Sequence, residues 1–107
     1  MQVTTDYTDT PPSRADIDAM TGPVLVEFGS AGCGYCRAAQ PLLTKATKRA
    51  PSLPHIKVAD GSGRPLGRTF QVRLWPTFIF MKDGKEVSRL VRPDTVAAIQ
   101  EALDSIT

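Results

Sequence analysis

Short apolar runs alternate along the chain with amphipathic stretches and with breaks rich in glycine and proline. Residues Val24–Phe28 form a mostly apolar, β-branched run between a proline and a glycine, which is typical of a strand buried on both faces. His55–Ala59 is a second predicted strand. Two further runs, Thr77–Met81 and Glu86–Val91, flank Asp83-Gly84, and this arrangement predicts a β-hairpin.

Helices are predicted before, between and after these strands. Ser13-Arg14-Ala15-Asp16 has the form of a capping box and begins a short helix. Apolar positions three and four residues apart predict a longer helix from Cys33 to about Arg49. One helical turn is expected near Leu66–Phe70. Asp94 is the predicted N-cap of a last helix, whose apolar residues recur at helical spacing: Val96, Ile99, Leu103 and Ile106.

This order of elements predicts an α/β fold with a central mixed sheet of about four strands and flanking helices. The first two strands are expected to be parallel and joined by a crossover, and the last two to form the antiparallel hairpin. The chain has 107 residues, of which 41% are hydrophobic, and this is enough for one globular domain with a core. We therefore assign residues 1–107 to a single domain with a loose polar segment over about residues 1–12.

Composition excludes several classes of protein. The net charge is only +2, and no apolar run approaches the roughly 18 residues that a membrane span needs. The polar start from Met1 to Asp6 lacks the basic and apolar regions of a signal peptide, so we expect a cytoplasmic protein unless a targeting segment has been removed ahead of Met1. Basic residues dominate the middle of the chain, but they are dispersed and lack interleaved stacking aromatics, which argues against nucleic-acid binding.

The two cysteines, Cys33 and Cys36, follow a predicted buried strand at the start of a predicted helix. A helix N-terminus favours negative charge, so we expect a thiolate nucleophile at Cys33, with Cys36 placed to attack a mixed disulfide formed there. A closed zinc site needs four ligands, and only the distant His55 is available besides the cysteines, so no metal is expected. A structural disulfide closing so short a loop constrains little chain. Redox exchange is therefore favoured over an inert pair of thiols.

Several motifs of the chain resemble those of the thioredoxin superfamily and follow one another in the same order. The resemblance extends over most of the chain, from about residue 17 to residue 106. Val24–Phe28 is similar to its central strand and Cys33-Gly34-Tyr35-Cys36 to its active site. Pro41 is similar to its helix-kinking proline, Trp75-Pro76-Thr77 to its cis-proline loop, and Lys82–Lys85 to its hairpin.

The resemblance implies a thioredoxin fold and a thiol–disulfide oxidoreductase that reduces protein disulfides through Cys33 and Cys36. It also implies that Pro76 is cis and lies opposite the cysteines, where the backbone of Trp75 pairs with an extended substrate. Gly34 and Tyr35 complete the expected substrate-binding set. No cofactor is expected in the domain; electrons are expected from a thioredoxin-reductase-type donor, and the protein is expected to be a monomer.

Glu27 stands where thioredoxins carry a buried aspartate beneath the second cysteine. The resemblance implies that its carboxylate moves a proton to or from Cys36. Its side chain is one methylene longer, which leaves its reach open, and the alternative is a strand-end glutamate that escapes to solvent. Lys57 is left out of the predicted site because it lies one position out of register with the lysine that thioredoxins often place there.

The presumed docking surface departs from the family pattern. Glycines replace tryptophans at Gly29 and Gly32, Tyr35 replaces a proline, and Arg92 lies near an expected glycine. These changes keep two alternatives open. One is a binding module that uses the cis-proline groove without turnover, and the other is an enzyme similar to glutaredoxins or disulfide isomerases.

Overall fold

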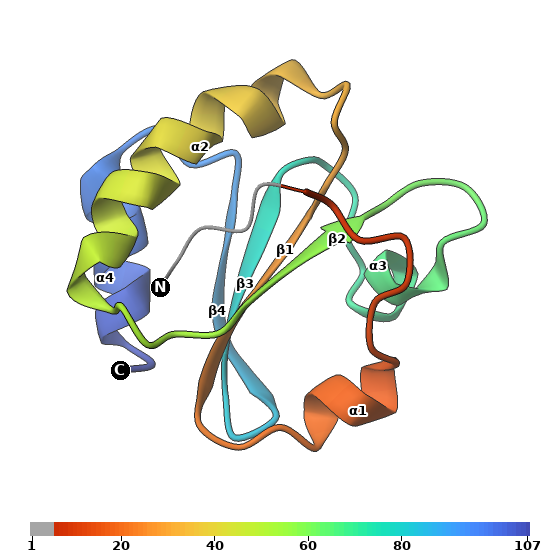
Figure 1. Cartoon of the computed structure of the whole chain (residues 1–107), viewed down its shortest axis with the longest axis horizontal. Helices are drawn as coiled ribbons and strands as arrows, with labels where there is room; N and C mark the ends of the chain where they lie inside the picture. Colours follow the sequence, from red (N-terminus) through yellow and green to blue (C-terminus); the bar gives the residue numbers. More distant parts are fainter. Residues whose placement is uncertain (1–5) are drawn as a thin grey trace.

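The computed structural model describes residues 6–107, which fold around one four-stranded sheet (Figure 1). The strand order across the sheet is β2-β1-β3-β4. The strands are β1 (Pro23–Gly29), β2 (His55–Ala59), β3 (Thr77–Lys82) and β4 (Lys85–Val91). β1 and β2 are parallel, whereas β1–β3 and β3–β4 are antiparallel. The predicted mixed sheet and its hairpin are therefore confirmed.

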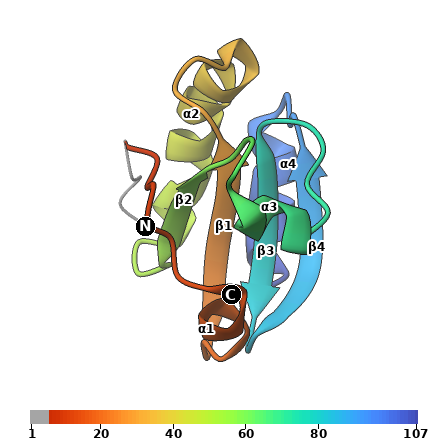
Figure 2. The same ribbon diagram turned by 90° about the vertical axis from the view of Figure 1, so that its right-hand side faces the viewer.

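Helices cover both faces of this sheet. α2 (Gly34–Ala46) and α4 (Val96–Asp104) lie on one side, and the short helices α1 (Arg14–Asp18) and α3 (Pro65–Thr69) lie on the other (Figures 1 and 2). A 3-10 turn, η1 (Thr47–Arg49), continues α2. This arrangement of a mixed sheet with helices on both faces is the one that the resemblance implied.

Two apolar cores result, one on each face. The larger joins the sheet to α2 and α4, and its buried residues include Leu25, Leu43, Phe78, Phe80, Ile99 and Leu103. The other joins the sheet to α1 and α3, and includes Ile17, Val26, Phe28, Phe70, Ile79 and Met81. Residues that alternate along β1 and β3 therefore face different cores, which is why these central strands are apolar on both faces.

The ends of two helices differ from the sequence prediction by a few residues. Cys33 is the N-cap of α2 rather than its first helical residue, and the α-helix ends at Ala46, where the last turn tightens into η1. Asp94 is not the cap of α4. The Thr95 hydroxyl accepts a hydrogen bond from the amide of Ala98 at 3.1 Å, so the cap lies one residue later.

The described part of the predicted loose segment, residues 6–12, is attached to the sheet. The Thr8 amide donates to the carbonyl of Lys57 at 2.8 Å, and the Ala59 amide donates to the carbonyl of Thr8 at 3.1 Å. Thr8 thus forms a parallel bridge with Val58 on the outer side of β2, where an edge strand leaves its backbone groups available. Residues 1–5 of that segment lie outside the described residues.

Strand direction brings the functional motifs together. β1 ends at Gly29, just before the cysteine loop, and β3 begins at Thr77, just after Pro76. The two strands are antiparallel and Phe28 is paired with Thr77, so the end of one strand lies beside the start of the other. The cysteine motif and the proline motif therefore meet at one edge of the sheet.

Candidate active site

Cys33 and Cys36 are separate thiols on the first turn of α2. Cys33 has an extended backbone (φ −87°, ψ 116°), and its Sγ accepts a hydrogen bond from the Cys36 amide at 3.1 Å. That amide is one of the donors that the start of a helix leaves without an intrahelical partner. Cys33 is partly exposed, while Cys36 is fully buried. One thiol is therefore accessible to another molecule, and the second lies behind it.

Burial governs the protonation of Cys36. Removal from water disfavours a thiolate, and the hydrogen bond with Cys33 adds to this, so the two effects together raise the pKa of Cys36 from its ordinary 9.0 to about 11. Two hydrogen bonds act in the opposite direction, one with the backbone of Ser30 and one with the Tyr7 side chain. The raising effects are the larger, so Cys36 is a thiol at neutral pH. The bonds with Ser30 and Tyr7 lower the free energy needed to form its thiolate.

The Trp75–Pro76 peptide bond is cis, as the resemblance implies, and its carbonyl side faces Cys33. The Cys33 sulfur lies 3.9 Å from the Trp75 carbonyl oxygen, and the Arg92 Nε donates to the same oxygen at 2.8 Å. The Arg92 guanidinium also lies 3.9 Å from the ring centroid of Tyr35, a side chain that is 61% exposed. A cation therefore sits beside the accessible thiol, held between the proline loop and the cysteine loop.

The Trp75 indole is partly buried beside this loop. Its Nε1 donates to the Asp60 carboxylate at 2.9 Å, and the Asp60 amide donates to the carbonyl of Gly29 at 2.9 Å. These bonds tie the proline loop to the end of β1. Gly34 is exposed as the first residue of α2, so it and Tyr35 lie on the outer surface of the same site.

Glu27 is fully buried on β1, which excludes the alternative of an escape to solvent. One carboxylate oxygen lies 2.9 Å from His55 Nε2, and the other accepts from Gln40 Nε2 at 2.9 Å. Gln40 also donates to the backbone carbonyl of Cys36 at 2.9 Å and accepts from Lys57 Nζ at 3.0 Å. A buried polar network thus runs from the strands to the cysteine helix.

The expected register of Lys57 was wrong, because Lys57 is paired directly with Glu27 in the β1–β2 ladder. The register of a parallel pair depends on the crossover, which the sequence pattern did not fix. His55, to which the sequence analysis gave no role in proton transfer, contacts the same carboxylate. Gln40 was missed as well, although its position four residues after Cys36 places it on the same helical face.

Tyr7 is the other residue that sequence reasoning missed. Its hydroxyl lies beside Gly29 on the side where the Cys36 sulfur also lies, and its ring centroid lies 4.5 Å from Lys57 Nζ. A Cβ atom built on Gly29 would lie 2.7 Å from the Cys36 sulfur and 3.0 Å from the Tyr7 hydroxyl oxygen. The absence of a side chain at Gly29 therefore leaves the space in which the tyrosine approaches the sulfur.

The described residues offer no group of three or more His, Cys, Asp or Glu side chains suited to a metal ion. Nor does any helix within residues 6–107 have the length and apolar character needed to cross a bilayer.

Comparisons with known proteins agree with this geometry. The family model described as Thioredoxin matches residues 8–105. A thioredoxin of Mycobacterium tuberculosis is 36% identical over 92 residues, which cover 85% of this chain and 79% of that protein. Thioredoxin H-type 1 of Nicotiana tabacum is 38% identical over 68 residues, covering 64% of this chain but only 54% of the tobacco protein. The solved structure of reduced thioredoxin 2 from Pseudomonas aeruginosa superposes with a TM-score of 0.86 at 50% identity, covering 97% of this chain and 96% of that one.

The raised pKa of Cys36 predicts a loss of stability in alkali for the reduced protein. Because the folded state holds this proton more tightly than the unfolded state, the contribution is complete below about pH 9 and is lost as the pH rises through about 11. We expect roughly 2 kcal/mol of unfolding free energy to be lost over this range, measured by urea titration of the reduced protein. The Cys36→Ala variant should not lose this amount of unfolding free energy over the same pH range. An equal loss in both proteins would show that the ionisation of Cys36 is not its cause.

Proposed function

The chain belongs to the thioredoxin family, and from that premise we propose that Cys33 and Cys36 are the residues that carry its thiol–disulfide exchange. Members of this family reduce protein disulfides, and the chain is a thiol–disulfide oxidoreductase of this type. The observation that supports the assignment of residues is the pairing of a partly exposed cysteine with a buried one at the start of α2.

Cys33 is the nucleophile in this proposal. Its thiolate attacks one sulfur of a substrate disulfide, a bond forms between Cys33 and that sulfur, and the other substrate sulfur leaves with the bonding electrons as a thiolate. The amide of Cys36, 3.1 Å from the Cys33 sulfur, stabilises the attacking thiolate by hydrogen bonding.

Cys36 then resolves the mixed disulfide. It loses its proton and attacks Cys33; the Cys33–Cys36 disulfide forms, and the second substrate sulfur leaves as a thiolate. The substrate disulfide is thereby reduced by two electrons and the cysteine pair is oxidised. A thioredoxin-reductase-type donor is the proposed source of the electrons that restore the dithiol.

Glu27 stays in the proposed site as a group that aids proton transfer at Cys36. Both of its oxygens bind other side chains, those of His55 and Gln40. Gln40 in turn binds the backbone carbonyl of Cys36, so the carboxylate acts on the thiol through its neighbours.

Gly34, Tyr35, Trp75 and Pro76 form the proposed docking surface for an extended substrate chain. Arg92 adds a fixed positive charge to it, because its guanidinium is held by both the Tyr35 ring and the Trp75 carbonyl. This charge favours substrates with acidic residues beside the disulfide. We further propose that the protein is a single domain and that it acts as a monomer in the cytoplasm.

The roles of the two cysteines predict opposite phenotypes for their serine variants. Cys33→Ser should lose at least about 10³-fold in the rate of insulin reduction, because no nucleophile remains at the accessible position. Cys36→Ser should instead accumulate a covalent mixed disulfide with its substrate, visible by non-reducing electrophoresis and mass spectrometry. Retention of reductase activity by Cys33→Ser would contradict the proposed mechanism.

The charge at Arg92 predicts a modest substrate preference. Of two disulfide peptides that differ only by Glu or Gln beside the cysteine, the acidic one should have a kcat/KM about threefold higher, the size expected of an exposed ion pair. Arg92→Gly should remove this preference, and the positive φ of 51° at this position suits a glycine. An undiminished preference in Arg92→Gly would show that Arg92 does not read the substrate charge.

A further inference from the structure

Tyr7 reaches the buried thiol from outside the cysteine helix. Its hydroxyl and the Cys36 sulfur converge on the open side of Gly29, 3.0 Å and 2.7 Å from the position that a Cβ would take there. The hydroxyl and the sulfur therefore border the same space beside Gly29. The exchange steps proposed above give Tyr7 no role, although the Cys36 sulfur beside it is one of the reacting atoms.

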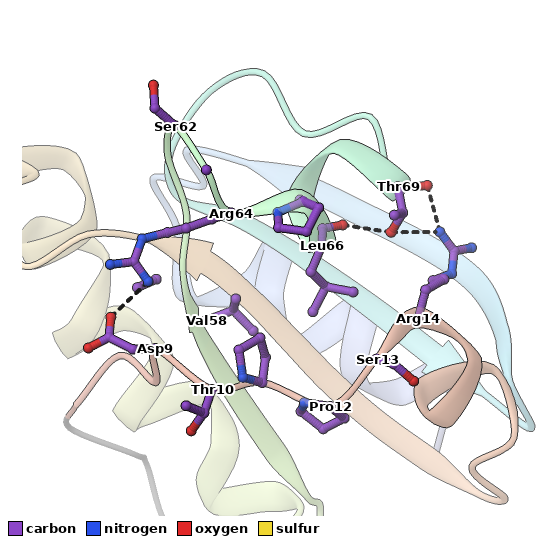
Figure 3. A pocket seen from close by; sticks show the side chains of 15 residues that line it. Asp9, Thr10, Pro12, Ser13, Arg14, Val58, Ser62, Arg64, Leu66 and Thr69 are labelled. Atoms are coloured by element: carbon purple, nitrogen blue, oxygen red, sulfur yellow. Dashed lines mark hydrogen bonds and ion pairs between the residues drawn. The ribbon is translucent and has the colours of Figure 1, made fainter.

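The position of Tyr7 is fixed by the contacts of its neighbours. The next residue, Thr8, forms the parallel bridge with β2, and Asp9 forms an ion pair with Arg64 at 2.8 Å. Figure 3 shows this ion pair at one end of a pocket of about 590 Å³ between the N-terminal segment and α3. The ring of Tyr7 is further held against Lys57. The tyrosine is therefore attached through β2 rather than through α2.

We propose that the Tyr7 hydroxyl donates a hydrogen bond to the Cys36 sulfur as it becomes a thiolate and thereby accelerates the resolution of the mixed disulfide at Cys33. This inference rests on the proposed roles of the two cysteines. The proton of Cys36 leaves with the aid of Glu27, as in the proposed function, and the Tyr7 proton stays on its oxygen. The bonds formed and broken are those of the resolving step above, so Tyr7 gains and loses no electrons.

The surroundings of Tyr7 keep its hydroxyl protonated, so Tyr7 acts as a hydrogen-bond donor and not as a base. Burial raises the pKa of Tyr7 well above its ordinary value, and the Glu27 carboxylate on β1 and the two cysteines of α2 add to this. The cation that faces the ring is Lys57 on β2. A phenol that holds its proton so strongly cannot deprotonate a thiol, but it can stabilise the thiolate once formed. The hydrogen bond accordingly lowers the pKa of Cys36, against the effect of burial.

The approach of Tyr7 to Cys36 depends on the glycine at position 29. A side chain at position 29 would occupy the space between the tyrosine and the sulfur, since its Cβ alone would lie within 3.1 Å of two Tyr7 atoms. The same Cβ would lie 2.7 Å from the Cys36 sulfur, which is closer than packed side chains tolerate. The glycine at the end of β1 therefore permits a donor from the N-terminal segment to reach the resolving cysteine.

Tyr7→Phe tests the proposal because it removes the hydroxyl and keeps the ring. The full-length reduced protein is mixed with one equivalent of 5,5′-dithiobis(2-nitrobenzoate) in a stopped-flow instrument. The first thionitrobenzoate reports attack by Cys33 and the second reports resolution by Cys36. In Tyr7→Phe we expect an unchanged first phase and a second phase about tenfold slower, as for loss of a hydrogen bond to a charged sulfur. The pH profile of the second phase should move to higher pH.

Two further variants distinguish a role of the hydroxyl from a structural role. Thr10→Val removes an exposed hydroxyl from the same segment and should leave both phases unchanged. Tyr7→Leu also removes the ring and should slow the second phase as much as Tyr7→Phe. A wild-type second phase and pH profile in Tyr7→Phe would overturn the proposal for Tyr7. Absence of the first phase in the wild-type protein would instead overturn the proposed role of Cys33.

Discussion

The sulfur of Cys36 is shut off from water where the first turn of α2 covers the end of β1, and a sulfur in that place resists ionisation. Disulfide exchange nevertheless requires this sulfur to become a thiolate, as the attacking group in one direction and as the leaving group in the other. The surrounding structure reconciles these demands with hydrogen bonds to the sulfur from the Ser30 backbone and Tyr7. Burial keeps the thiol neutral at rest, and the donors limit the free energy needed to ionise it.

The same constraint explains why polar groups gather beneath the cysteine helix. Glu27, Gln40 and Lys57 are linked by hydrogen bonds between β1, α2 and β2, in a region that is otherwise apolar. Each buried polar group there has a partner, which avoids the cost of an unsatisfied charge or amide. The network joins the helix that carries the cysteines to the two parallel strands. It therefore holds the reacting sulfurs in a fixed position relative to the sheet and to Tyr7.

Much of the fold was predictable, because β1 and β3 are short apolar runs, Asp83-Gly84 marks the hairpin between β3 and β4, and the cysteine motif lies between a strand and a helix. The contacts among the site residues were less predictable. The contact between Tyr7 and Cys36 depends on a single backbone bridge at Thr8, and a polar segment without periodicity gives no signal of such a bridge. The pairing of Glu27 with Lys57 depends on strand register, which a one-residue error changes completely.

The reduction potential of the Cys33–Cys36 pair, obtained by equilibration against dithiol or glutathione buffers, shows whether burial of Cys36 sets the redox behaviour of the site. A pair becomes oxidising when its reduced form is stabilised as thiolates, and burial of Cys36 opposes this. We therefore expect a reducing couple near the value known for thioredoxins, about −270 mV. A potential near about −180 mV, typical of protein disulfide isomerase, would contradict it.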